Sequence, residues 1–128
     1  MRITDAPRRM QARRVVPLAS RRRPAYQPGM FSHVVIFWTR TDKPSATEEL
    51  LAGAERYLRP IPGVLSFHIG RMVPSERPVV DGSYQVALNL QFQDKHSQDD
   101  YQVHPLHLEF VEKTFKPNCE RVVIYDFE

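Results

Sequence analysis

A short stretch near the end of the chain concentrates the side chains that can transfer protons. Residues 100–107 read Asp-Tyr-Gln-Val-His-Pro-Leu-His, so the phenol of Tyr101 and the imidazoles of His104 and His107 lie close together in the sequence. Imidazole, with an unperturbed pKa of about 6.5, accepts a proton at neutral pH. A tyrosine hydroxyl can donate a hydrogen bond to a carbonyl oxygen that becomes enolate-like. The pattern therefore predicts His107 as a base, with Tyr101 as its partner, for abstracting a proton next to a carbonyl.

Helical geometry separates the two histidines of this stretch. On a helix that begins near Pro105, Val111 lies about 40° from His107 and Phe110 about 60° on the other side. His107 therefore sits in the middle of an apolar face that points at the sheet. His104 directly precedes Pro105, and we expect it to be a helix-entry residue whose ring caps the helix or packs locally.

A third imidazole comes from the first strand of the domain. Residues 31–38, Phe-Ser-His-Val-Val-Ile-Phe-Trp, are β-branched and aromatic and apolar on both faces, which is typical of a central strand. Alternation places His33 on the same face as Val35 and Phe37. His33 and His107 are thus expected to approach one interior space. For either histidine alone, a hydrogen-bonded core residue without catalytic function is the commoner alternative, and that interpretation stays open.

Metal and cofactor sites are not indicated by the sequence. His104 and His107 could bind zinc together only if the helix began before Pro105, and no carboxylate or cysteine lies at ligand spacing. The chain contains no phosphate loop, dinucleotide fingerprint or serine nucleophile elbow. We therefore expect no metal, and any reaction here is expected to be cofactor-free.

The elements that position these residues follow a simple order. Ser45-Ala-Thr-Glu48 has the pattern of a capping box and opens a helix that Pro60 and Pro62-Gly63 terminate. Strands are predicted at residues 64–70, 84–92 and 120–127, and helices at 94–101 and from 105 to about 116. With the first strand, the order is β-α-β-β-α-β, which predicts an α+β fold with a ferredoxin-like subunit.

The second face of the predicted sheet is also apolar. Val34, Ile36 and Trp38 point away from the helices, as does part of the last strand. An exposed apolar patch of this kind usually has a partner. A homodimer formed sheet to sheet is the economical solution.

Charge divides the chain into an arm and a domain. Residues 1–29 carry eight arginines against one acid, a net charge of 8 − 1 = +7, while the remainder has 10 Lys/Arg against 14 Asp/Glu, or −4. The domain, residues 30–128, therefore gives no reason to expect nucleic-acid binding. Its single cysteine, Cys119, excludes an internal disulfide and fits a reducing, cytoplasmic compartment. The longest apolar run, residues 34–38, is too short to span a membrane.

The arm at residues 1–29 contains four prolines among its arginines and is expected to be disordered. Three interpretations stay open. In the first, translation starts at Met30 and the arm is not made. In the second, the arm is an Arg-rich organelle-targeting peptide. In the third, it is a basic segment that touches anionic polymers or surfaces.

Several of these stretches together resemble the stress-responsive dimeric α/β-barrel (Dabb) family over residues 30–127. They are Phe31-Ser-His-Val-Val, Ile61-Pro-Gly-Val64, Tyr101-x-x-His104-Pro105-x-His107 and Val122-Val-Ile-Tyr-Asp126. The resemblance implies a ferredoxin-like subunit that dimerises through its sheet into an α+β barrel, with a cavity between sheet and helices in each subunit.

The resemblance also implies an activity. A plant polyketide cyclase of this family uses a histidine matching His107 as base and a tyrosine matching Tyr101 at the carbonyl, and a histidine matching His33 lines its site. Three functions follow as expectations. The first is a non-enzymatic, stress-associated homodimer with an internal pocket. The second is a cofactor-free cyclase-like enzyme acting on a β-keto or polyketide-like acyl ligand. The third, by fold analogy, is a cofactor-independent monooxygenase.

Overall fold

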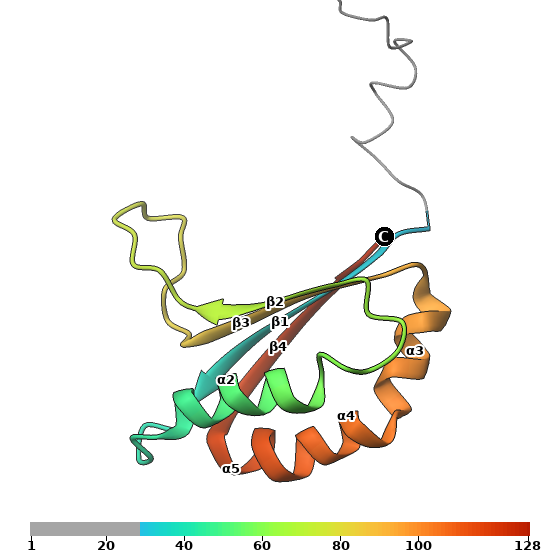
Figure 1. Cartoon of the computed structure of the whole chain (residues 1–128). Coiled ribbons are helices and arrows are strands. Elements are labelled where there is room, and N and C mark those ends of the chain that lie inside the picture. Colours follow the sequence, from blue (N-terminus) through green and yellow to red (C-terminus); the bar gives the residue numbers. More distant parts are fainter. Residues whose placement is uncertain (1–28) are drawn as a thin grey trace, which may run out of the picture.

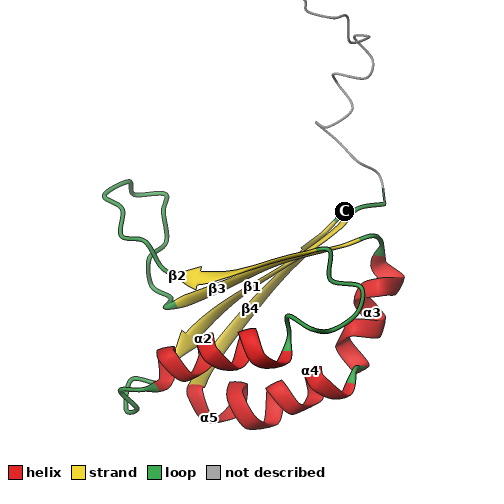
Figure 2. Ribbon diagram, viewed as in Figure 1, coloured by secondary structure: helices red, strands yellow, loops and turns green. Residues whose placement is uncertain are grey.

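The computed structural model describes residues 29–128, so the predicted arm lies almost wholly outside the described residues. Its strands are β1 (Phe31–Thr39), β2 (Ser66–Arg71), β3 (Val86–Phe92) and β4 (Cys119–Phe127). Its helices are α2 (Ala46–Tyr57), α3 (Lys95–Val103), α4 (Pro105–Phe110), the π-helical turn η2 (Val111–Phe115) and α5 (Lys116–Asn118). The strands form one antiparallel sheet in the order β2-β3-β1-β4. All the helices lie on one face of that sheet (Figures 1 and 2), which confirms the predicted ferredoxin-like arrangement.

Strand β1 is central because both of its edges are paired. It runs antiparallel to β3 on one side and to β4 on the other. Phe31, His33, Val35 and Phe37 are buried under the helices, as the alternation predicts, whereas Val34, Ile36 and Trp38 on the opposite face are only partly covered.

Helix α2 forms as predicted, but its N-terminus is not a capping box. Ser45 makes no capping bond to the backbone; its hydroxyl donates instead to Glu49 at 2.7 Å. Glu48 does not reach back to Ser45 but pairs with Arg71 of β2 at 2.6 Å. The prediction of a capping box was therefore wrong, because the two side chains found better partners one helical turn away and on the sheet.

The C-terminal helical run is longer than predicted and contains an irregular turn. It continues through Pro117 to Asn118 instead of ending near Lys116. Proline has no N–H to donate to the preceding turn, and its ring crowds the carbonyl there. The wider π turn η2, directly before α5, gives room for this residue.

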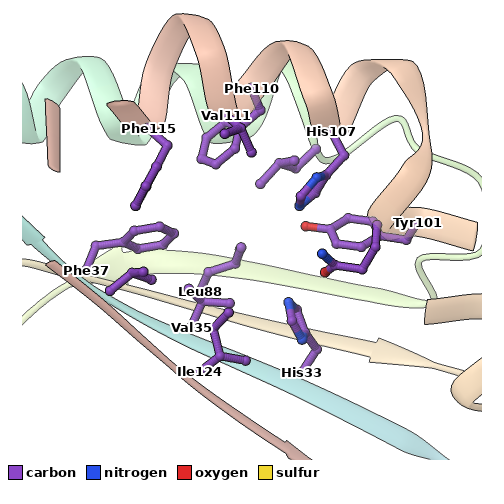
Figure 3. A pocket seen from close by; sticks show the side chains of 13 residues that line it. His33, Val35, Phe37, Leu88, Tyr101, His107, Phe110, Val111, Phe115 and Ile124 are labelled. Atoms are coloured by element: carbon purple, nitrogen blue, oxygen red, sulfur yellow. The ribbon is translucent and has the colours of Figure 1, made fainter. Parts of the chain in front are cut away.

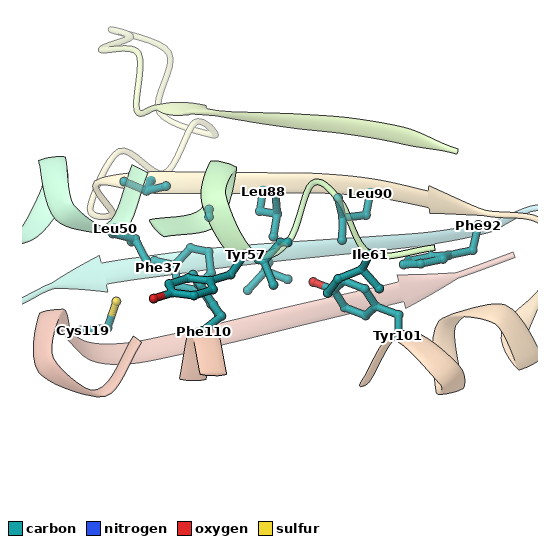
Figure 4. Packing of buried hydrophobic residues seen from close by; sticks show 14 of the residues in the cluster. Phe37, Leu50, Tyr57, Ile61, Leu88, Leu90, Phe92, Tyr101, Phe110 and Cys119 are labelled. Carbon is teal, nitrogen blue, oxygen red and sulfur yellow. The ribbon is translucent and has the colours of Figure 1, made fainter. Parts of the chain in front are cut away.

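The hydrophobic core fills the layer between the helices and the sheet (Figure 4). Leu50 and Ala54 of α2 and Leu88 and Leu90 of β3 belong to this core, and all four are almost completely buried. The first and third strands thus contribute one face each to the core, as their alternation predicts. Strand β3 begins at Val86, so Tyr84, predicted to belong to it, lies outside; its ring packs against Trp38 with centroids 6.5 Å apart.

Candidate functional site

A cavity of about 150 Å³ lies between the sheet and the C-terminal helical run (Figure 3). One end of the cavity is polar and the rest of its wall is apolar. Its lining residues are His33, Val35, Phe37, Leu58, Leu88, Tyr101, Gln102, His107, Phe110, Val111, Phe115, Val122 and Ile124.

The cavity brings together the three side chains that the sequence singled out. His33 rises from β1, Tyr101 comes from α3, and His107 comes down from α4, as Figure 3 shows. The Tyr101 ring lies 4.9 Å from the ring of His107 and 5.9 Å from that of His33, centroid to centroid, in edge-to-face orientations. Tyr101 thus stands between two imidazoles that are 74 residues apart in the sequence.

His33 is held by a carboxylate. Its Nδ1 lies 2.5 Å from Oδ1 of Asp126, which is its direct neighbour across the β1–β4 pairing. A carboxylate at this distance accepts the Nδ1–H, so the hydrogen bond selects the tautomer in which Nε2 carries the free lone pair. Asp126 is a site residue that the sequence reasoning did not assign, because only the strand register places it beside His33.

His107 has the opposite situation. Within residues 29–128, its buried Nδ1 has no hydrogen-bond partner. Burial lowers the pKa of His107 below its usual value, and the proximity of His33 lowers it further. The ring is therefore neutral at neutral pH and can accept a proton.

Tyr101 is a hydrogen-bond donor over the whole physiological pH range. Its side chain is 1% exposed. Burial raises the pKa of its hydroxyl well above the usual value, since a buried phenolate would lose its hydration. The hydroxyl consequently keeps its proton beside His107.

Gln102 is a second residue that the sequence reasoning missed. It lines the cavity, and its amide oxygen accepts a hydrogen bond of 2.9 Å from the amide of buried Gln98. This bond leaves the Gln102 amide N–H groups free to donate. Gln102 lies just beyond the predicted helix at residues 94–101, and its direction became clear only because α3 continues to Val103.

The remaining histidines lie outside the cavity. His104 caps α4, and its Nδ1 accepts the backbone N–H of Leu106 at 3.0 Å, which confirms the predicted helix-entry role. His68 and His96 are exposed. Among residues 29–128, no group of three or more His, Cys, Asp or Glu side chains is arranged to hold a metal ion.

The sequence of this chain matches a known protein family. Residues 31–128 match the family described as the Stress responsive A/B Barrel Domain, Dabb. The chain belongs to this family. A search of curated proteins found no match. None of the described helices is long and apolar enough to cross a membrane.

Solved structures of similar proteins agree with the family membership. The chain is similar to a Dabb family protein with a ferredoxin-like fold from Mesorhizobium loti, at 29% identity over 78% of this chain and 96% of that one, with a TM-score of 0.64. It is similar to the Arabidopsis thaliana protein At3g17210, at 26% identity over 77% and 93% of the two chains, with a TM-score of 0.63. A dimeric protein of unknown function from Bacteroides fragilis shares the ferredoxin-like fold, at 24% identity over 80% and 99%, with a TM-score of 0.57.

Proposed function

We propose that this Dabb protein is a cofactor-free acid–base catalyst that abstracts a proton next to the carbonyl of a small molecule. The observation that carries the proposal is the neutral imidazole of His107, with its unpaired Nδ1, beside the protonated hydroxyl of Tyr101 in the wall of the cavity. A base and a donor held at one carbonyl are the two parts that enolate chemistry needs.

The reaction would proceed in two steps, as in a cyclase. His107 takes the proton from the carbon next to the carbonyl, and the hydroxyl of Tyr101 and the amide of Gln102 donate hydrogen bonds to the oxygen that gains charge. The resulting enolate carbon forms a bond to a second carbonyl carbon, in the same molecule or in another one. The alkoxide formed there takes back a proton from the imidazolium of His107, so that no proton is gained or lost.

The His33–Asp126 pair supports this scheme from the opposite wall. The Asp126 carboxylate holds His33 in the tautomer with a free Nε2. This orients a second proton acceptor toward the cavity. His33 is therefore proposed to hold the substrate or to relay the proton, with Asp126 as its positioning residue.

Proton abstraction is measurable without knowledge of the natural substrate. Exchange of the methyl protons of acetophenone for deuterium in D₂O, followed by NMR, reports the first step directly. We expect the wild-type protein to accelerate exchange and His107→Gln to lose about 100-fold or more of that acceleration. Tyr101→Phe is expected to lose about 10- to 100-fold.

The matched control is His68→Gln, because His68 is an exposed histidine outside the cavity. Its exchange rate should equal that of the wild type. Exchange by wild-type protein no faster than in buffer, or an undiminished rate in a folded His107→Gln variant, would refute the proposal. The histidines would then be structural residues that hold helix to sheet, as in the non-enzymatic alternative.

We also propose that the protein is a homodimer joined through the open face of its sheet. Tyr125 and Phe127 of β4 are 59% and 61% exposed on that face, beside the partly covered Val34 and Ile36. These four side chains form an apolar patch, of the kind that a partner covers. The relative from Bacteroides fragilis is described as dimeric, which supports this proposal.

A further inference from the structure

The cavity has two unlike ends. In Figure 3, His107 and Tyr101 stand at one end, while Phe37 and Phe115 stand at the other. A ligand that fills the cavity must therefore carry a hydrogen-bonding group at one end and an apolar body at the other. The size, charge and shape of the wall restrict this ligand further.

The space within the cavity wall accommodates about one ring. An apolar cavity of about 150 Å³ in an engineered protein accommodates benzene, and the cavity here has the same volume. A single ring with a carbonyl substituent fills it. A linear polyketide or an acyl thioester would extend far outside it.

Charge excludes an ionised ligand. None of the thirteen lining residues is Lys, Arg, Asp or Glu. A carboxylate or phosphate placed among these side chains would lose its hydration without gaining a counter-ion, which is strongly unfavourable. The part of the ligand inside the cavity is therefore neutral.

Aromatic walls favour an aromatic body. The Phe37 ring lies 6.5 Å from that of Phe110 and 6.1 Å from that of Phe115, at interplanar angles of 71° and 56°. Such edge-on and tilted arrangements are the ones that aromatic rings prefer, and a further ring can join them. Phe115 belongs to the π turn η2, so this irregular turn decides how far its ring reaches into the cavity.

We infer that the ligand of this cavity is a neutral, single-ring aryl ketone, with Phe115 as a specificity-determining residue. The carbonyl oxygen lies toward the hydroxyl of Tyr101, and the ring lies against Phe37 and Phe115. The inference rests on the proposed function for the placement of the carbonyl. The binding of the ring depends only on the cavity.

Calorimetric titration of the full chain with three aryl ketones tests the inference. Acetophenone should bind, 4-acetylbenzoate should bind at least about tenfold more weakly because of its carboxylate, and 2-acetonaphthone should bind at least about tenfold more weakly because of its second ring. Equal or tighter binding of either larger probe, or no saturable binding of acetophenone, would overturn the inference.

Two variants test whether the ligand binds in this cavity. Phe115→Ala should reverse the preference, so that 2-acetonaphthone binds more tightly than acetophenone. Phe67→Ala is the matched control, since Phe67 packs against the core but does not line the cavity, and it should keep the wild-type order. An unchanged preference in a folded Phe115→Ala variant would contradict the inference.

The binding assay and the exchange assay can each refute one proposal without affecting the other. Acetophenone that binds in the predicted order without exchanging its protons would refute the proposed catalysis and leave the ligand class standing. Exchange that is faster with 2-acetonaphthone than with acetophenone would support the catalysis and refute the ligand class.

Discussion

His33 and His107 face the same cavity in different hydrogen-bonding states, and this difference assigns them different chemistry. The Nδ1 of His33 is bound to Asp126, while the Nδ1 of His107 has no partner among the described residues. A buried polar atom without a partner is costly, at about 1–3 kcal/mol, so a native structure that retains one usually has a use for it. The unpaired nitrogen of His107 is thus the strongest single sign of function in this chain.

The lowered pKa of His107 predicts a particular pH dependence of stability. Below pH about 6.5 the unfolded chain protonates this histidine, while the folded protein does not until its lower pKa is reached. The free energy of unfolding should therefore decrease as the pH falls from about 6.5 to the lower pKa of the folded state, by up to about 1.4 kcal/mol per pH unit from this group. In urea unfolding between pH 8 and pH 5, His107→Gln should show a smaller decrease than the wild type.

The exposed His68 again provides the control. His68→Gln should reproduce the wild-type decrease. A His107→Gln variant with the full wild-type decrease would show that burial of His107 does not affect its proton affinity.

The bond between His33 and Asp126 predicts a measurable change of tautomer. Asp126→Ala removes the acceptor, so the ¹⁵N spectrum of the His33 ring should change from the single Nδ1–H form to a mixture. Loss of this bond should cost about 1 kcal/mol, which is below the usual range for bonds to charged groups, because the carboxylate is 40% exposed and partly screened. Glu120→Ala, on the same strand and exposed, should change neither quantity, and an unaltered His33 spectrum in Asp126→Ala would contradict the assignment.

At the level of elements, the cavity depends on how closely α2 approaches the C-terminal helical run. Gly53 of α2 is buried against Thr114 of η2, and a Cβ atom added at Gly53 would lie 2.4 Å from the side chain of Thr114. The helices can touch only because residue 53 has no side chain. The π turn contributes Val111 and Phe115 to the cavity from the same segment, so this packing and the cavity wall are linked.

This close approach reverses the usual effect of replacing glycine in a helix. Gly→Ala in a helix interior ordinarily stabilises by up to about 1 kcal/mol. Gly53→Ala should instead destabilise by about 1–3 kcal/mol, measured by urea unfolding, because the backbones must separate. Thr114→Ala in the same chain should recover part of the loss.

Gly70→Ala serves as the comparison, since a Cβ there meets nothing closer than 3.9 Å. It should have a small effect. If Gly53→Ala proved as stable as the wild type, the two helices would not be packed as closely as described.

At the level of the whole molecule, the sheet has one covered and one open face. The helices cover the face that carries His33, and the open face carries Ile36 and Trp38, with Arg121 stacked over the Trp38 ring at 4.0 Å. Because the two faces alternate along β1, the strand that holds the site also presents the proposed dimer contact. Dimerisation would therefore brace the strand on which His33 and its neighbours stand.

The dimer proposal is tested by introducing a charge on the open face. Light scattering of the wild type at micromolar concentration should give the mass of two 14.9 kDa chains, whereas Ile36→Glu should give one, because the interface cannot solvate a buried carboxylate. Ala52→Glu, at an exposed position of α2, should remain dimeric. A monomeric wild type would refute the proposal.

Local periodicity was enough to predict much of this protein. Alternation along the first strand placed His33 inward, the 100° helical step placed His107 inward, and the proline after His104 made that residue a cap. The order of strands and helices predicted the ferredoxin-like sheet. These features depend on interactions between residues that are near in the sequence, and such interactions can be read from spacing and residue type.

Tertiary structure alone decided the rest. Asp126 lies 93 residues from His33 and meets it only through the register of β1 and β4. The expected capping box at Ser45 does not form, because Glu48 pairs with Arg71 on strand β2. The volume of the cavity, and the unpaired nitrogen of His107 beside it, depend on how side chains from six elements pack together. The sequence by itself determined which residue types could do chemistry and which way each would face; long-range packing determined which of them meet.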